Sequence, residues 1–389
     1  MLAVLAQFGG DLLSTLLWLI LFIVFMFFGP RLMTTQVVMK LEKEVADLEE
    51  MAEDSRKYIV KSISKKPDKR LKTSVRNFME FFAVSPVGTD PYGIMKKIDH
   101  IIKNSDQRLR YFVNEIAPGA SEEKKRNLRN ALGGAITTHQ IAKIVRHYLE
   151  LIKKYKMFQL AMVIQMQIPL IARIAKAAKN ATHAFVIGMP IGDGIGPLVT
   201  ASLMDKKVKR FEKEEFVLTK AKLDGREFWI SKAEGPGAST GYPGKFLLKF
   251  LKRQKIDRII TIDAGLKLEG EKTGIIAEGV GVAMGGTGVD RYEIEEFAVK
   301  KDIPLDAIAI KVSDEEALTP MKEEVIDSVP NAIETLKKYL KRANKKERIL
   351  VIGVGNTCGI GNDNKAAKQA EIRLRKHNKK IKRKKGREE

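Results

Sequence analysis

The feature that most constrains this chain is a run of 18 uncharged residues near its N-terminus, from Leu12 to Gly29, with the sequence LLSTLLWLILFIVFMFFG. As a helix this run would be about 27 Å long, which is close to the thickness of the hydrocarbon core of a bilayer. A cleaved signal peptide would carry basic residues before the run, but none precedes it. We therefore predict a retained transmembrane helix in a single-pass protein of the cell membrane.

Positive charge begins only after this run, from Arg31 and Lys40 onward. The positive-inside rule then places the N-terminus outside the cell and the rest of the chain, including the C-terminus, in the cytoplasm. The single cysteine, Cys358, excludes a disulfide within the chain and suits a reducing compartment.

A second uncharged stretch, MFQLAMVIQMQIPLIA, lies between Lys156 and Arg173. It contains three glutamines and Pro169, so we predict a buried helix of a soluble bundle, with membrane entry of residues 157–172 as the alternative. Apolar residues at helical spacing also predict an amphipathic juxtamembrane helix, which packs either on a partner helix or on its own domain. These residues are Leu41, Val45, Leu48 and Ala52.

The net charge of +22 is distributed unevenly along the chain. Residues 31–180 carry +13 and residues 364–389 carry +9, while the region between them is nearly neutral. Basic segments of this kind favour anionic lipid or nucleic acid as partners. We expect a membrane anchor over 1–30, a helical basic juxtamembrane domain over 31–181, an α/β domain over 182–363 and a disordered basic tail over 364–389.

Five short β-rich runs predict the strands of the third region. They are HAFVIGM from His183, REFWISKA from Arg226, DRIITID from Asp257, AIAIKVS from Ala307 and RILVIGV from Arg348. Helical patterns lie between them, and this alternation predicts an α/β fold with a mostly parallel sheet. In such sheets ligands bind at the carboxyl ends of the strands, where Gly and Asp cluster in this sequence.

Two acidic residues follow these runs, Asp193 in the loop GMPIGDGIGP and Asp263 at the end of RIITID. If the two loops are neighbours, the carboxylates could share a proton as a catalytic acid–base pair or bind a metal. The alternative is that each Asp caps its own turn. Cys358 could act as a nucleophile only if a base were close to it. The residues expected to bind a ligand beside the pair are Gly192, Gly194, Gly196, Gly355 and Asn356.

The stretch GMPIGDGIGPLVTASL resembles the first loop of the hydrogenase-maturation endopeptidases and of the spore-germination protease family. IDAGLK resembles the second acidic strand end of that superfamily, and GVGVAMGGTGVD resembles the glycine-rich segment of its germination branch. The resemblance covers residues 183–312, and to 362 at its widest. It implies a phosphorylase/hydrolase-like α/β fold with Asp193 and Asp263 as the paired acids. The histidine that serves the first branch as a third metal ligand is missing, because no histidine lies between His183 and His377. The cofactor therefore stays unknown, with a divalent metal as one possibility.

Taken whole, the chain also resembles an uncharacterised archaeal membrane-anchored family, which implies no activity. Two functions therefore remain open. The first is a membrane-anchored hydrolase that faces the cytoplasm and acts on a peptide or protein through the acidic pair. The second is a non-enzymatic membrane factor that binds a ligand or partner, with the basic tail contacting the ribosome, its RNA or anionic lipid.

Overall fold

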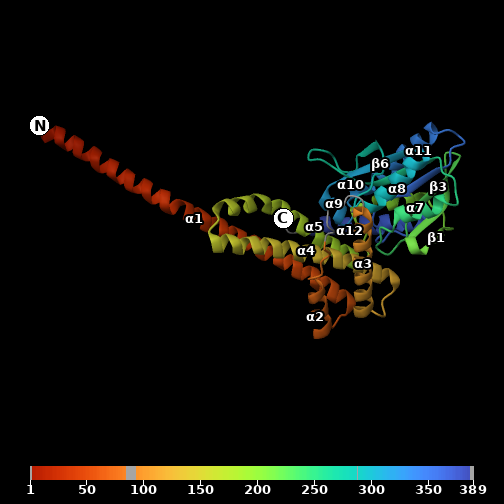
Figure 1. Ribbon diagram of the computed structural model, residues 1–389, viewed down its shortest axis with the longest axis horizontal. Coiled ribbons are helices and arrows are strands. Elements are labelled where there is room, and N and C mark those ends of the chain that lie inside the picture. Colours follow the sequence, from red (N-terminus) through yellow and green to blue (C-terminus); the bar gives the residue numbers. More distant parts are fainter. Residues whose placement is uncertain (1, 85–92, 287, 386–389) are drawn as a thin grey trace. The chain divides into compact units, whose positions relative to one another are not determined.

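The computed structural model describes residues 2–84, 93–286 and 288–385, with side chains described over 14–26 and 35–383 inside those ranges. The chain divides into two compact units (Figure 1). Unit 1 consists of Met1–Glu53 and Thr138–Ala175, and unit 2 consists of Asp54–Thr137 and Lys176–Glu389. Helices α1 (Leu2–Ile63), α4 (Glu122–Tyr155) and α5 (Phe158–Val186) contribute residues to both units. Each unit is therefore assembled from segments that are far apart in the sequence.

Unit 1 is built from segments of these three helices around an aliphatic core. The juxtamembrane residues Leu41, Val45 and Leu48 are buried there against Val145, Leu149 and Ile152 of α4 and Ala161 and Ile168 of α5. The amphipathic face of α1 thus packs on its own unit, which was one of the two alternatives. Exposed ion pairs, including Arg146 with Glu49 and Lys153 with Glu42, lie outside this core.

The predicted membrane segment is part of the continuous helix α1. Within it, every side chain from Leu16 to Met26 is exposed, including Trp18 and Phe25 at 72% each. Among the described residues Ser14–Met26 forms a shorter apolar helix, and α5 alone has the length and hydropathy to cross a membrane. One face of α5 is buried in unit 1, whereas Met162, Met166 and Leu170 are exposed. Both the N-terminal anchor and its topology therefore remain predictions.

The helical segments of unit 2 that precede its sheet include α2 (Lys69–Phe78), α3 (Ile94–Ile116) and the first part of α4. Helix α2 begins because the side chain of Asp68 accepts a hydrogen bond from the Leu71 amide, which satisfies a free donor of the first turn. Apolar residues of all three pieces join the core of the unit, among them Val75, Phe112 and Leu128.

The sheet of unit 2 has seven strands in the order β1-β2-β3-β7-β4-β6-β5. The strands are β1 (Lys209–Phe211), β2 (Phe216–Leu223), β3 (Arg226–Ala233), β4 (Arg258–Leu266), β5 (Ile276–Val280), β6 (Leu305–Val312) and β7 (Ile349–Gly353). The four central strands β3, β7, β4 and β6 are parallel, while β1, β2 and β5 are antiparallel to their neighbours. The α/β class is confirmed, but the sheet is mixed rather than mostly parallel, because both edges are built by antiparallel strands.

One predicted strand is wrong. HAFVIGM does not enter the sheet, because α5 continues to Val186 and a turn follows. Ala177, Ala181 and Ala184 are buried at spacings of four and three, so the segment extends a helical stripe that was already formed. The other four runs correspond to β3, β4, β6 and β7.

Helices cover both faces of the sheet. Side chains such as Ile260 and Val351 pack with α6 (Ile195–Leu203), α11 (Val329–Arg342) and α12 (Asn364–Lys385). Their strand neighbours Ile259 and Leu350 pack on the other face with α7 (Pro243–Leu251) and α8 (Val289–Lys301). Because alternate side chains of β4 and β7 are buried on opposite faces of the sheet, the sequences of these strands are continuous hydrophobic runs. Short elements complete the unit: η1 (Gly192–Gly194), η2 (Glu212–Glu214), α9 (Asp314–Leu318) and α10 (Glu323–Ile326).

The C-terminal segment differs from the predicted disordered tail. Asn364–Lys385 forms α12, which buries Ala367, Ala370 and Leu374 in the core of unit 2. Arg375 and Lys382 pair with Asp327 and Glu323. The three apolar residues are spaced by three and four, so they form a single helical face, and burial of that face stabilises the segment.

Candidate active site

The loop that carries Asp193 lies against the loop that follows β7. Asp193 belongs to the turn η1, directly before α6, and its Oδ2 accepts a hydrogen bond of 2.8 Å from the amide of Asn356. The Gly192 amide is fixed in turn by the carbonyl of Thr319, at 3.0 Å. The strand that was predicted to precede Asp193 is absent. Asp193 is instead held at the carboxyl end of the central strand β7 by its bond to the loop that follows that strand.

The predicted ligand-binding glycines allow these loops to approach each other closely. A Cβ on Gly196 would collide with the carbonyl oxygens of Ile262 in β4 and Val354 after β7. A Cβ on Gly194 would lie 2.7 Å from the carbonyl oxygen of Asn356. A Cβ on Gly192 would meet the backbone of Glu316. Gly355 has a φ of +125° and would meet the backbone of Asp193. Contact between loops explains why these positions are glycine, and a role in ligand binding stays a prediction.

Asp263 lies near the carboxyl end of β4, the strand that pairs with β7. It is only 4% exposed, and its Oδ1 accepts a hydrogen bond of 2.7 Å from the amide of Ala264. The amide of Gly285 also bonds to this carboxyl group. The second acid is thus buried, and the donors that bond to it among the described residues are backbone amides.

Burial raises the pKa of both carboxyl groups. For Asp193 desolvation is the main cause, and the hydrogen bond from Asn356 opposes it. The pKa of Asp263 is raised well above its usual value, first by desolvation and then by the negative charge of Asp193. Within the described part of the chain, no cation is among the causes of either shift. The negative charge of Asp193 therefore favours the protonated form of Asp263.

A chain of amides extends from this pair into α4. The Asn356 side chain donates to the Oδ1 of Asn130 and accepts from the amide of Cys358. Asn127, one helical turn before Asn130, accepts from the amide of Ala238 at 2.8 Å. Asn356, which was predicted only as a ligand residue, therefore also fixes the loop that bonds to Asp193.

Cys358 does not meet the requirements of a nucleophile. It is fully buried, its Sγ faces the Oδ1 of Asn127 at 3.8 Å, and burial raises the pKa of the thiol to about 12. A thiolate is the reactive form, so this environment disfavours the reaction that was considered for it.

The donor set beside Asp193 and Asp263 does not fit a metal centre. Over the described residues, no group of three or more His, Cys, Asp or Glu side chains could hold a metal ion. The two carboxylates receive backbone N–H donors, which compete with a cation for the same oxygens. No step is therefore assigned to a metal.

A buried lysine near the same sheet edge was missed in the sequence. Lys232, near the end of β3, is fully buried and donates to the carbonyl of Ala233 and to Oδ1 of Asn362. Desolvation lowers its pKa to about 7. Its charge is affected by Glu234 and Asp363 rather than by the acidic pair, so we assign it no part in that pair. The alternation of REFWISKA could have indicated that this position points into the protein.

A cluster of ion pairs was also missed. Glu215, after η2, accepts a hydrogen bond of 2.6 Å from Arg110 of α3 and one from Ser239. Asp106 of α3 bonds to Arg110, and also to Arg129 of α4. In the sequence Glu215 lies in the charged run FEKEEF, which gives no sign that this glutamate is 5% exposed.

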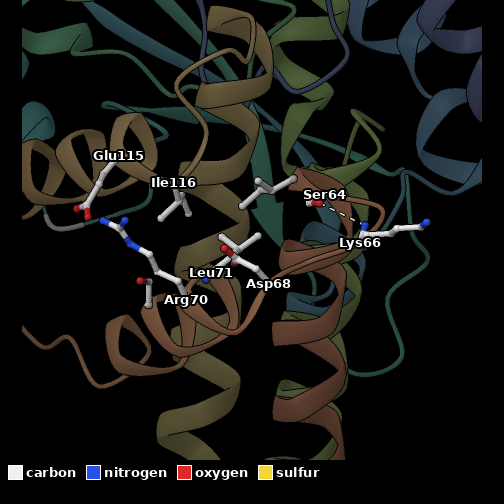
Figure 2. Close-up of a pocket in the computed structure, with 9 residues that line it drawn as sticks. Ser64, Lys66, Asp68, Arg70, Leu71, Glu115 and Ile116 are labelled. Atoms are coloured by element: carbon white, nitrogen blue, oxygen red, sulfur yellow. Dashed lines mark hydrogen bonds between the residues drawn. The ribbon is translucent and has the colours of Figure 1, made fainter.

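A pocket of about 460 Å³ lies apart from these residues, between the end of α1, α2 and the end of α3. Figure 2 shows the side chains of Arg70 and Glu115 pointing toward each other across it, while Lys66 points away. Its lining mixes both charge signs with Ile63, Leu71 and Ile116, and it contains none of the predicted site residues.

Two family models match consecutive parts of the chain. One is described as the N-terminal domain of a protein of unknown function (DUF1512) and matches residues 15–188. The other is the C-terminal domain of the same family and matches residues 191–361. No curated protein and no solved structure matches the chain. The boundary between the two matches falls directly before the turn that carries Asp193, so the acidic pair lies wholly in the C-terminal domain. Because the two matches together cover most of its length, this chain belongs to the DUF1512 family.

Proposed function

We propose that unit 2 is a hydrolase in which Asp193 and Asp263 act as general base and general acid. The observation that carries this proposal is that both carboxyl groups have raised pKa values and that the charge of Asp193 contributes to the shift of Asp263. Perturbed acids with different environments at the carboxyl ends of parallel strands are typical of catalytic pairs.

The reaction follows from this distribution of protons. The ionised carboxylate of Asp193, whose charge the Asn356 amide stabilises, removes a proton from water as the water oxygen adds to a carbonyl carbon. Protonated Asp263 then gives its proton to the leaving nitrogen as the carbon–nitrogen bond breaks. The water proton held by Asp193 returns to Asp263, which completes the cycle. A peptide or protein substrate is the class that the resemblance of the two acidic loops implies.

The test uses the full-length protein and a mixture of fluorogenic peptides. Asp193→Asn and Asp263→Asn should each lower the rate of hydrolysis by about 100-fold or more, because acid–base groups contribute on that scale. Asp205→Asn, at an exposed aspartate of the same unit, is the matched control and should hydrolyse at the rate of the unaltered protein. Hydrolysis that survives both site substitutions would contradict the proposal.

A second candidate is a factor that binds a peptide without cleaving it. It is favoured by the burial of Asp263, which at 4% exposed has little access to the water that hydrolysis requires. In this case the unaltered protein would bind the labelled peptides without hydrolysing them, and Asp193→Asn would weaken binding.

We also propose that the apolar part of α1 anchors the protein in the cell membrane, with the C-terminus in the cytoplasm. Support comes from the exposed side chains of Leu16–Met26 and from the basic residues after them. Leu19→Arg with Phe22→Arg should move the protein to the soluble fraction, because each arginine costs about 3 kcal/mol at the centre of a spanning helix.

Met162→Arg with Met166→Arg, on the exposed face of α5, is the matched comparison for the membrane test. If the α5 substitutions release the protein from the membrane and the α1 substitutions do not, the N-terminal anchor is contradicted. The membrane segment would then be α5, which is long enough to span a bilayer. Protease protection of the C-terminus in intact cells would confirm the cytoplasmic side, and cleavage from outside would overturn it.

A further inference from the structure

Helix α12 presents a line of cations that form no ion pair with the residues whose side chains the structure describes. Its long side chains fall on one side of the helix, since at 3.6 residues per turn the positions concerned lie within about 60° of a common direction. All of them are exposed, and none forms an ion pair with another described residue. We call this surface the α12 stripe; it consists of Lys365, Lys368, Lys376, Lys379, Lys380 and Arg383.

The opposite side of α12 is fixed to unit 2. Ala367, Ala370 and Leu374 are buried, and Arg373 donates to the carbonyl oxygen of Gly188. The side chain of Asn378 bonds to the carbonyl of Met321. The stripe is therefore held on a docked helix, and its cations do not need a folding transition before they meet a ligand.

The spacing of the stripe suits a polyanion. From Lys365 to Arg383 it extends about 27 Å along the helix, with a cation at most turns. Between Asn364 and Arg383 the sequence contains one acidic residue, Glu371. That carboxyl group is half-buried, so desolvation raises its pKa, while the cations of Arg375 and Lys368 lie close enough to oppose this effect.

The burial of the apolar face of α12 favours nucleic acid over lipid as the ligand of the α12 stripe. A helix that lies on a membrane inserts an apolar face between the lipids, but the apolar face of α12 is already buried in unit 2. Ile372 and Ile381 are the exposed large apolar side chains of α12 among the described residues, and nine residues of helix place them on opposite sides, so they form no common apolar face. A nucleic-acid backbone requires only regularly placed cations. We propose that the α12 stripe binds the phosphate backbone of nucleic acid without reading its sequence, a role that does not depend on the acidic pair.

The experiment measures binding of a labelled single-stranded polyuridylate to the full-length protein over a range of salt concentrations. Replacing Lys368, Lys376 and Lys379 by glutamine should weaken binding at low salt on the order of tenfold or more. The slope of log affinity against log salt should fall by about 2, since each phosphate contact on a single strand contributes about 0.7. Glutamine is compatible with a helix, and an unchanged circular dichroism spectrum would show that α12 remains folded.

The matched control replaces Lys338, Lys345 and Lys346 by glutamine, which removes the same charge from exposed positions of unit 2. This control should retain both affinity and slope. Equal losses in the two triple variants would overturn the proposal in favour of net charge alone. A stripe variant that loses binding to phosphatidylserine vesicles but keeps its affinity for polyuridylate would overturn it in favour of lipid. Failure of the unaltered protein to bind polyuridylate or a mixed-sequence duplex would overturn it outright.

Discussion

Two clusters of buried or half-buried acids in unit 2 have opposite electrostatics. Glu215 and Asp106 lie among arginines of α3 and α4, and hydrogen bonds from Ser239 and Arg110 outweigh burial, so the pKa of Glu215 is lowered. Asp193 and Asp263 accept hydrogen bonds from backbone amides in the described part of the chain, and burial raises the pKa of both. Acids that only hold a fold together are neutralised by cations, whereas a pair without cations costs stability and suits proton transfer.

The largest change in stability is expected when the cluster around Glu215 loses its buried carboxylate. Glu215→Gln should lower the free energy of unfolding by about 3–5 kcal/mol at neutral pH, because Arg110 and the 9%-exposed side chain of Arg129 would lose a buried counter-charge. Urea unfolding measures the change. Glu227→Gln, which removes one acid of an exposed pair with Lys220, is the control and should change it by less than about 1 kcal/mol. If both variants lost the same free energy of unfolding, the ion pair of Glu215 would contribute no more than the exposed pair of Glu227 with Lys220.

A smaller effect of opposite sign is expected at the acidic pair. Asp263 keeps its proton in the folded protein at pH values where the unfolded chain has already released it. The free energy of unfolding therefore falls as the pH rises from about 3.8 to the raised pKa of Asp263. Asp263→Asn keeps an acceptor for the Ala264 amide and removes this cost. It should raise the free energy of unfolding at pH 7 by about 1–2 kcal/mol, with no gain below pH 3.8.

The two clusters should also differ in the direction of their pH dependence. The contribution of Glu215 is present above its unfolded pKa and is lost as pH falls through its lowered value, so the deficit of Glu215→Gln should shrink in acid. Urea titrations of both variants at several pH values test this. Parallel pH profiles in the two variants would contradict the contrast between the clusters.

The sequence predicts the fold best where a residue's role is local. The strands β3, β4, β6 and β7 were found because β-branched and aromatic residues are concentrated in them, while β5, which is short and mostly exposed, has a weaker signal. The spacing of Ala367, Ala370 and Leu374 could have predicted α12, but the high charge of the segment obscured it.

At the candidate site, too, the sequence predicted local features better than contacts between distant segments. Asp193 and Asp263 were found because Gly and Asp cluster in their loops, yet their sheet-edge position was inferred in part from a strand that does not exist. Asn356 was found, but its bond to Asp193 arises from packing between loops 163 residues apart. Glu215 and Arg110 could not be found, since only the folded chain brings them together and removes them from water.

Titration of Asp263 itself measures most directly whether the charge of Asp193 favours its protonated form. Carboxyl ¹³C resonances of aspartate in the full-length protein, assigned by comparison with Asp263→Asn, would report its pKa. Asp263 should titrate well above 3.8, and Asp193→Asn should lower its pKa by removing the neighbouring charge. A pKa near 3.8 that does not respond to Asp193→Asn would contradict the coupling between the two acids.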